Sequence, residues 1–371
     1  MRRTGTVIML AVLLFALSGC GWLDGSYVHL TPHRAQTGGF SGEELTAKDE
    51  PEFRKILETM VSSGQESAVI YAVDLDMDEI DRIMHRVEKY ILESYPIGAY
   101  AVEDMSFELG IGGGKTAVAV KAAYHHTVAE IQRIPRLKDM EQASAAVEES
   151  LRDCDARTVF FVEKYRDADF SQLVQNLALT YPEAVMETPR VEENVFGKGA
   201  SRVVELLFTY ENSRDVLRQM QTQVKPVFDS AVLYVSGEGA DSQKFGQLYG
   251  FLMERFDYQV ETSITPPYSL LRHGVGDSRA FATVYAAMCR MAGLDCRIVT
   301  GTRQGEPWVW NMVFDEELPY HVDLLACSQL GGYREMTDGE MTGYVWDYSA
   351  YPASNPKPVP QEESAPEADS G

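Results

Sequence analysis

Basic residues are scarce in this 371-residue sequence: 33 lysines and arginines stand against 56 aspartates and glutamates, a formal net charge of -23. Proteins that bind nucleic acid attract its phosphates with clustered lysine and arginine, so this balance excludes nucleic acid as an expected partner. Cysteine is scarce as well, with five residues and no CxxC pair, which excludes a zinc ribbon and a dense disulfide scaffold. We therefore expect no metal site and no cofactor.

Long apolar runs are also rare. The segment Val7–Leu17, preceded by Arg2 and Arg3, is too short to span a bilayer comfortably, and no later run approaches the ~18 residues of a membrane-spanning helix. The chain nevertheless is 45% hydrophobic and 10% aromatic, which is enough to build packed cores. Its length indicates two or three domains.

Residues Leu17–Cys20, with the letters LSGC, match the lipobox of bacterial lipoproteins. This resemblance implies that residues 1–19 are a signal peptide and that Cys20 is diacylated. The mature chain would then be extracytoplasmic and anchored to membrane lipid. The alternative is an ordinary cleaved signal peptide in which Cys20 has no role. We expect residues 20–50 to form a tether with little structure, and residues 353–371, rich in Pro, Glu and Ser, to form a disordered acidic tail.

Two similar segments, residues 51–140 and 141–227, occupy the middle of the chain. In each, an apolar strand precedes an amphipathic helix, and a glycine-rich turn then joins two further strands. The helices end at Tyr95-Pro96 and Tyr181-Pro182, because proline restrains the residue before it and cannot continue the pattern. We therefore predict two duplicated α/β modules with the order β-α-β-β.

The turn of the first segment, Gly110–Gly114, is followed by Lys115 and Thr116, as in a phosphate-binding loop. That loop also needs a glycine six positions before the lysine, where this chain has Leu109. The spacing therefore predicts a hairpin turn and not a nucleotide site.

Residues 228–352 contain three sequence blocks and a closing segment. The blocks are Leu271–Ala282 continuing to Met288–Cys296, then Gly305–Val313, then Tyr320–Asp323, and the closing segment holds Tyr344, Trp346-Asp347 and Tyr351-Pro352. In this order and spacing they resemble the transglutaminase-like family, a branch of the papain-like cysteine-protease architecture. The resemblance implies a helix packed on an antiparallel sheet, so the fold class is α+β.

The pattern of the same residues agrees with that fold. Apolar residues recur at helical spacing after Asp277 and Ser278, either of which suits a helix start, and Gly293 is a natural stop. Short strand-like runs follow. They are Arg297–Gly301, Trp308–Phe314 and Tyr320–Leu324.

The family resemblance implies a catalytic Cys at the helix start, a His on the adjacent strand and an Asp on the next. In this chain these positions hold Ser278, Trp308 and Asp323. A serine hydroxyl needs a general base far more than a thiol does, and an indole N–H donates without offering a basic lone pair. We therefore expect no catalytic residue here, and predict a degenerate domain that is no longer an enzyme.

Other residues could replace the missing groups. His273 and His321 lie near Ser278 and Asp323 in the sequence, so a serine-nucleophile amidase or peptidase acting on cell-wall peptides is the alternative function. Cys289 lies late on the predicted helix, and buried cysteine usually acts as a small apolar residue.

The preferred hypothesis is a non-catalytic binding or structural module of the cell envelope. A candidate groove beside Trp308, Trp310 and Tyr344 would suit an extended peptide or a glycan strand.

Overall fold

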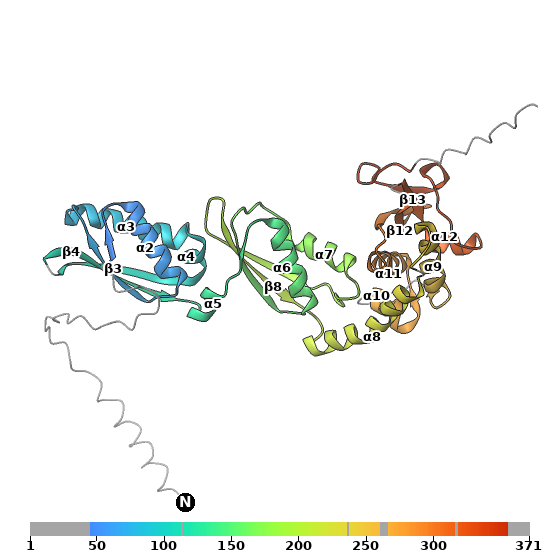
Figure 1. Ribbon diagram of the computed structural model, residues 1–371, viewed down its shortest axis with the longest axis horizontal. Helices are drawn as coiled ribbons and strands as arrows, with labels where there is room; N and C mark the ends of the chain where they lie inside the picture. The colour runs from blue at the N-terminus through green and yellow to red at the C-terminus, as the bar shows by residue number, and fades with distance from the viewer. Residues whose placement is uncertain (1–44, 113, 236, 260–265, 316–317, 355–371) are drawn as a thin grey trace, which may run out of the picture. The chain divides into compact units, whose positions relative to one another are not determined.

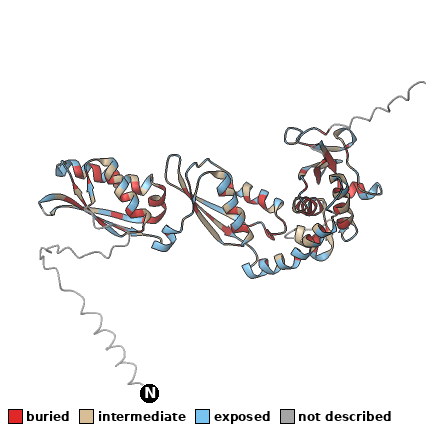
Figure 2. Cartoon of the chain, in the orientation of Figure 1, coloured by how far each residue is buried: buried red, intermediate tan, exposed pale blue. Residues whose placement is uncertain are grey.

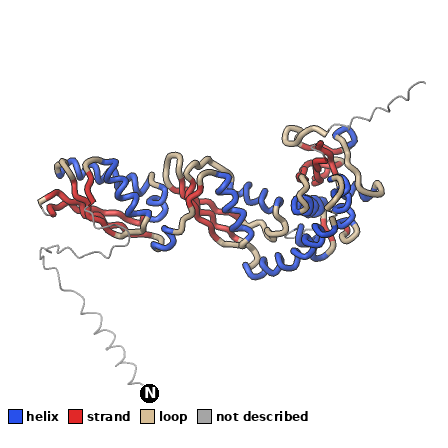
Figure 3. The backbone as a smooth tube through the Cα atoms, viewed as in Figure 1, coloured by secondary structure: helices blue, strands red, loops and turns tan. Residues whose placement is uncertain are grey.

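The computed structural model describes residues 45–112, 114–235, 237–259, 266–315 and 318–354. The predicted signal peptide and Cys20 lie outside these residues. Helices and small sheets alternate along the chain, which confirms the α+β fold class (Figure 1, Figure 3). No helix in the described part of the chain combines the length and the apolar character needed to cross a membrane.

The first module is a four-stranded sheet with helices packed against it. The helix Met77–Glu93 (α3) buries a continuous apolar stripe against the sheet. The residues of this stripe are all at most 5% exposed: Ile80, Ile83, Met84, Val87 and Ile91. The sheet order is β1-β2-β4-β3, and only β1 is parallel to its neighbour. Its elements are β1 (Leu45–Ala47), α2 (Glu50–Ser62), β2 (Ser67–Ala72), α3 (Met77–Glu93), α4 (Pro96–Ala101), β3 (Val102–Gly112) and β4 (Lys115–Tyr124).

The second module repeats this arrangement with the sheet order β5-β6-β8-β7. A short helix, α5 (Val128–Gln132), precedes it. Its elements are β5 (Arg136–Leu137), α6 (Met140–Arg152), β6 (Arg157–Val162), α7 (Phe170–Thr180), β7 (Arg190–Phe196) and β8 (Arg202–Thr209).

Local details of the two modules also match. Asp49 and Asp139 cap α2 and α6 by accepting a backbone hydrogen bond at their first turns. Gly64 and Cys154, after the ends of the same helices, both have left-handed backbone with φ of 67° and 51°. Each module begins with a strand and a helix that the predicted β-α-β-β order omits. These are β1 and α2 in the first module, and β5 and α6 in the second.

The glycine-rich turn of the first module closes a hairpin, as predicted. Gly112 pairs with Lys115 at the end of the β3–β4 ladder, and Gly114 has a φ of 79° that favours glycine.

The C-terminal domain packs helices against one face of an antiparallel sheet with the order β13-β12-β11-β14. Its central helix is buried along most of its length, as Figure 2 shows. The elements are α8 (Arg214–Tyr234), α9 (Asp241–Met253), β9 (Asp257–Tyr258), α10 (Pro266–His273), β10 (Val275–Gly276), α11 (Ser278–Met291), β11 (Cys296–Arg303), β12 (Glu306–Asp315), β13 (Leu318–Val322), α12 (Leu324–Gln329), a 3₁₀ turn (Asp338–Glu340) and β14 (Tyr344–Trp346).

Three predicted boundaries change. The tether does not extend to residue 50, because β1 already pairs with β2. The second module starts before residue 141, since β5 pairs with β6. The boundary at 227/228 falls inside α8, whose Leu217 and Phe228 both join the C-terminal core.

Residues 355–371 of the predicted tail 353–371 lie outside the described residues, whereas residues 353 and 354 are described and Ser354 is packed. Ser354 is 4% exposed, and its backbone N–H donates to Asp338 Oδ1 at 3.2 Å. The chain is therefore part of the C-terminal domain at least as far as Ser354.

Candidate functional site

Ser278 is the first residue of α11. Asp277 caps this helix by accepting a hydrogen bond from the Ala280 N–H at 2.8 Å. The Ser278 side chain is half-buried and accepts a hydrogen bond from the Val309 N–H of β12 at 3.4 Å. This bond is long, so the hydroxyl is held weakly.

Asp323 lies directly after β13 and caps α12. It is 1% exposed, and its Oδ1 accepts the backbone N–H groups of Leu325 at 3.0 Å and Ala326 at 3.1 Å. These two bonds fix one carboxylate oxygen, because they satisfy amides that have no partner within the helix.

The other oxygen, Asp323 Oδ2, accepts two side-chain hydrogen bonds and forms one ion pair. Trp308 Nε1 donates at 2.8 Å and the Tyr344 hydroxyl at 2.6 Å, while Arg303 Nη1 lies 3.5 Å away. The Arg303 guanidinium also lies over the rings of Trp308 and Tyr344, at 5.2 and 5.5 Å from their centres. Trp308 therefore makes the contact with Asp323 that an imidazole would make in a catalytic triad.

The charge state of this cluster follows from its burial. Burial and the nearby Asp323 carboxylate hold the pKa of Tyr344 well above its ordinary value, so the phenol stays neutral and donates. Two backbone amides, an indole, a phenol and a guanidinium surround Asp323, and no contact given for the described residues joins it to Ser278.

His321 faces a different set of groups. Trp310 Nε1 donates to His321 Nδ1 at 3.0 Å, so Nε2 carries the proton and donates to Asp338 Oδ1 at 2.9 Å. Burial lowers the pKa of His321, and Asp338 raises it in part. Both ring nitrogens are thus occupied, and neither can accept a proton from Ser278.

His273, the other candidate base, ends α10 and is exposed. Its ring meets the Tyr268 ring edge-on, with the centres 6.2 Å apart. Among the contacts of the described residues, none joins His273 to Ser278.

The cysteines of the described residues are free thiols and sit in packed surroundings. Cys289 is fully buried, and burial holds its pKa far above the ordinary value. Burial likewise raises the pKa of Cys327 to about 11. Neither forms a thiolate at neutral pH, so neither is a reactive thiol.

The predicted groove needs one correction. Trp310 is 1% exposed and packs against Tyr344 and Trp346, so it belongs to the core and cannot line an open groove. Trp308 and Tyr344 remain half-buried. No cluster of His, Cys, Asp and Glu among the described residues could hold a metal ion.

Comparison with known proteins agrees with this geometry. Residues 230–336 match the model of the transglutaminase-like superfamily. The chain carries a transglutaminase-like domain. No curated protein matches the chain.

Three solved structures are similar to parts of the chain. They are a proposed cysteine protease from Cytophaga hutchinsonii (13% identity, 40% of this chain and 65% of that one, TM-score 0.26), a protein named as a TGase (10%, 51% and 59%, 0.26) and a proposed protease from Parabacteroides distasonis (8%, 69% and 39%, 0.23). The chain thus covers less than two thirds of each of these structures.

Within the transglutaminase-like domain, the structure brings Trp308 and Asp323 together and leaves Ser278 at the nearby helix start. The sequence did not point to Arg303, which reaches Asp323 because β11 pairs with β14 and places Arg303 opposite Tyr344. That strand pairing has no signature in the sequence around Arg303.

Proposed function

We propose that the transglutaminase-like domain is a non-catalytic binding or structural module. The observation that carries this proposal is the complete engagement of Asp323 by Trp308, Tyr344, Arg303 and two backbone amides. A triad aspartate acts by orienting an imidazole, and here the ring that it contacts has no basic nitrogen.

The serine position supports the same proposal. A serine hydroxyl becomes a nucleophile only when an adjacent base takes its proton. Both nitrogens of His321 are committed to Trp310 and Asp338, and His273 contacts Tyr268 instead.

An acyl-transfer assay tests the loss of chemistry. Full-length protein is incubated with a glutamine-containing peptide, with and without a fluorescent primary amine, and the products are resolved by mass spectrometry. We expect neither hydrolysis nor amine incorporation, and no difference between the wild type and Ser278→Ala. Turnover by the wild type that disappears in Ser278→Ala would instead support the serine amidase or peptidase.

We also propose that Cys20 carries the lipid that anchors the protein to the cell membrane, where the domain would meet envelope peptides or glycans. The supporting pattern is LSGC at Leu17–Cys20 after a charged start and a short apolar run. In a bacterial host, we expect acyl groups on Cys20 by mass spectrometry and recovery in the membrane fraction. Cys20→Ala should remove the acyl groups, and an unmodified Cys20 in the wild type would contradict the proposal.

A further inference from the structure

Two cysteines of the C-terminal domain, Cys289 and Cys296, lie together outside the cluster around Asp323. Cys289 is in the last turn of α11 and is 0% exposed, whereas Cys296 is the first residue of β11 and is half-buried. Both are free thiols, and both contribute to the same apolar core. The function proposed above uses neither of them.

The packing of α11 on the sheet explains why these cysteines meet. The Asn311 side chain of β12 donates to the Ala282 carbonyl of α11 at 2.9 Å, so the helix touches the sheet at this point. Cys289 lies about two helical turns further along the same side of α11. Two residues beyond Asn311, and on the same face of the sheet, Val313 pairs with Cys296. The Cys296 side chain therefore lies on the face that α11 covers, near the end of the helix.

The two thiols are in direct contact. The Cys289 and Cys296 side chains are hydrogen-bonded to each other, and Tyr285 and Tyr333 lie close to both. Burial holds the pKa of the Cys289 thiol far above its ordinary value, and the neighbouring Cys296 raises it further. Two thiols in contact have only to approach to a sulfur–sulfur distance of about 2.05 Å to form a disulfide.

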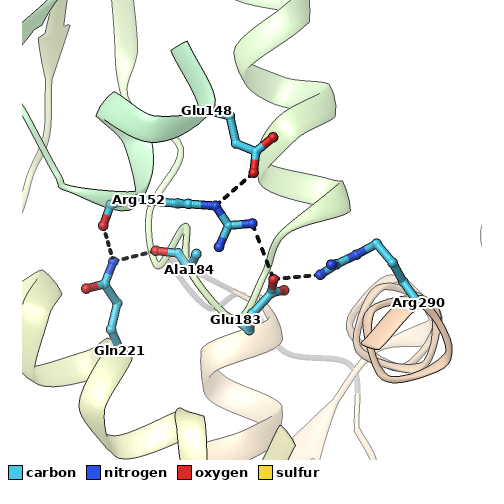
Figure 4. Close-up of polar contacts among 6 residues, drawn as sticks. All are labelled: Glu148, Arg152, Glu183, Ala184, Gln221 and Arg290. Atoms are coloured by element: carbon cyan, nitrogen blue, oxygen red, sulfur yellow. Dashed lines mark hydrogen bonds and ion pairs between the residues drawn. The ribbon is translucent and has the colours of Figure 1, made fainter. Parts of the chain in front are cut away.

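Both cysteines are held by fixed parts of the fold. Arg290, the residue after Cys289, pairs with Glu183 in the loop after α7 at 2.6 Å (Figure 4). The Cys289 carbonyl accepts the Leu294 N–H at 2.9 Å, which closes the end of α11. Cys296 is fixed by its place in the β11–β12 ladder. A bond between the two sulfur atoms therefore requires little rearrangement of the backbone.

Of the two cysteines, Cys296 is the one that a small reagent can reach. It lines a cavity of about 640 Å³, together with Arg290, Leu294 and Arg297 at the end of α11. Cys289 does not line this cavity and is fully buried. A reagent therefore meets Cys296 first, and Cys289 reacts only through it.

We propose that Cys289 and Cys296 are a redox-active pair, which a small organic disulfide converts into an intramolecular disulfide. The Cys296 sulfur attacks one sulfur of the oxidant, whose S–S bond breaks and releases one thiolate, leaving a mixed disulfide on Cys296. The Cys289 sulfur then attacks Cys296 Sγ, the mixed bond breaks, and a second thiolate leaves. The two thiolates take up the two thiol protons, so the protein loses two hydrogens and the oxidant becomes two thiols.

The order of these steps follows from the surroundings of each thiol. Cys289 does not start the exchange, because its thiol is buried and stays protonated. Its contact with Cys296 makes the second step intramolecular, which compensates for the small fraction of thiolate. The inference is independent of the chemistry of Ser278. An oxidising compartment, which the proposed lipid anchor would provide, allows such a bond to persist.

Peptide mapping tests the proposal. Folded full-length protein in detergent micelles is incubated with cystamine, then denatured, alkylated with iodoacetamide and digested with trypsin. Cleavage after Arg290 places Cys289 and Cys296 in separate peptides, so only a disulfide can keep residues 280–290 and 291–297 joined. We expect this linked pair to account for most of both cysteines, and dithiothreitol to separate it.

Three variants define the reaction. Cys296→Ser should leave Cys289 alkylated, whereas Cys289→Ser should keep a cysteamine adduct on Cys296, because nothing displaces it. The matched control is Cys154→Ser, which should retain the linked pair, since Cys154 contacts the Gln221 amide and not a thiol. The wild-type map decides the question even if a variant fails to fold. Full alkylation of Cys289 in the treated wild type, a lasting cysteamine adduct on its Cys296, or linkage of either residue to another cysteine would each overturn the proposal.

Discussion

The two ends of the candidate site differ in how firmly they are held. At one end, Asp323 is buried, accepts four hydrogen bonds, two from the backbone and two from side chains, and pairs with Arg303. At the other, Ser278 is half-buried and accepts one hydrogen bond at 3.4 Å. A working triad also holds its aspartate firmly, but it needs in addition a nucleophile aligned to a base. The difference indicates that the cluster around Asp323 stabilises the sheet and the loops beside it, while Ser278 is a helix-start residue.

The largest expected effect comes from Asp323. Asp323→Ala leaves the buried donors of Trp308 and Tyr344 unpaired and removes the partner of Arg303. We expect a loss of about 3 kcal/mol in the free energy of unfolding, measured by urea denaturation. A loss below about 0.5 kcal/mol would contradict a stabilising role for the cluster.

Removing only the indole donor gives a smaller effect. Trp308→Phe keeps an aromatic ring in place but cannot donate to Asp323, so we expect a loss of about 2 kcal/mol. Tyr344→Phe is the matched comparison, since it removes the hydroxyl that donates to the same oxygen as the indole. If either variant were as stable as the wild type, the corresponding hydrogen bond would contribute nothing.

The pH dependence of the free energy of unfolding tests whether His321 is neutral in the folded protein. Burial lowers its pKa in the folded protein, so the unfolded chain takes up the proton first as the pH falls. The contribution of neutral His321 to the free energy of unfolding should therefore be at its full value above pH 6.5. It should decrease as the pH falls from 6.5 through the lowered pKa of the folded state. His126, whose pKa burial also lowers, adds to this slope. His321→Gln should make the slope shallower, and a stability that rises on acidification to pH 5 would be incompatible with a neutral buried His321.

The smallest expected effect is at Ser278. Its hydrogen bond from Val309 is long and the side chain is half-buried, so Ser278→Ala should change the free energy of unfolding by less than about 0.5 kcal/mol. The measurement is again urea denaturation, with Asp323→Ala as the contrasting variant. A loss comparable to that of Asp323→Ala would remove the difference between the two ends of the site.

Much of the C-terminal domain could be predicted from the sequence because its signals are local. The apolar period after Ser278, the Asp277 cap and the stop at Gly293 all lie within one helix, and Gly293 has the expected left-handed φ of 78°. The strands around Trp308 and Tyr320 also follow from short apolar runs.

The remaining features depend on contacts between distant parts of the chain. β1 and β5 have three and two residues, too few to show any alternation, and each exists because it pairs with a neighbouring strand. The contact of Arg303 with Asp323 likewise arises from the β11–β14 pairing. The burial of Trp310 does not follow from the sequence, because neighbouring aromatic residues on a strand are compatible with an exposed groove as well as with a core.

The reactivity of Ser278 shows most directly whether its hydroxyl has an activating base. Full-length wild type and Ser278→Ala are incubated with a fluorophosphonate, which modifies serines that a base activates, and their intact masses are measured. We expect no phosphonyl adduct on either protein. An adduct on the wild type that maps to Ser278 and is absent from Ser278→Ala would contradict it, because the hydroxyl would then have an activating base.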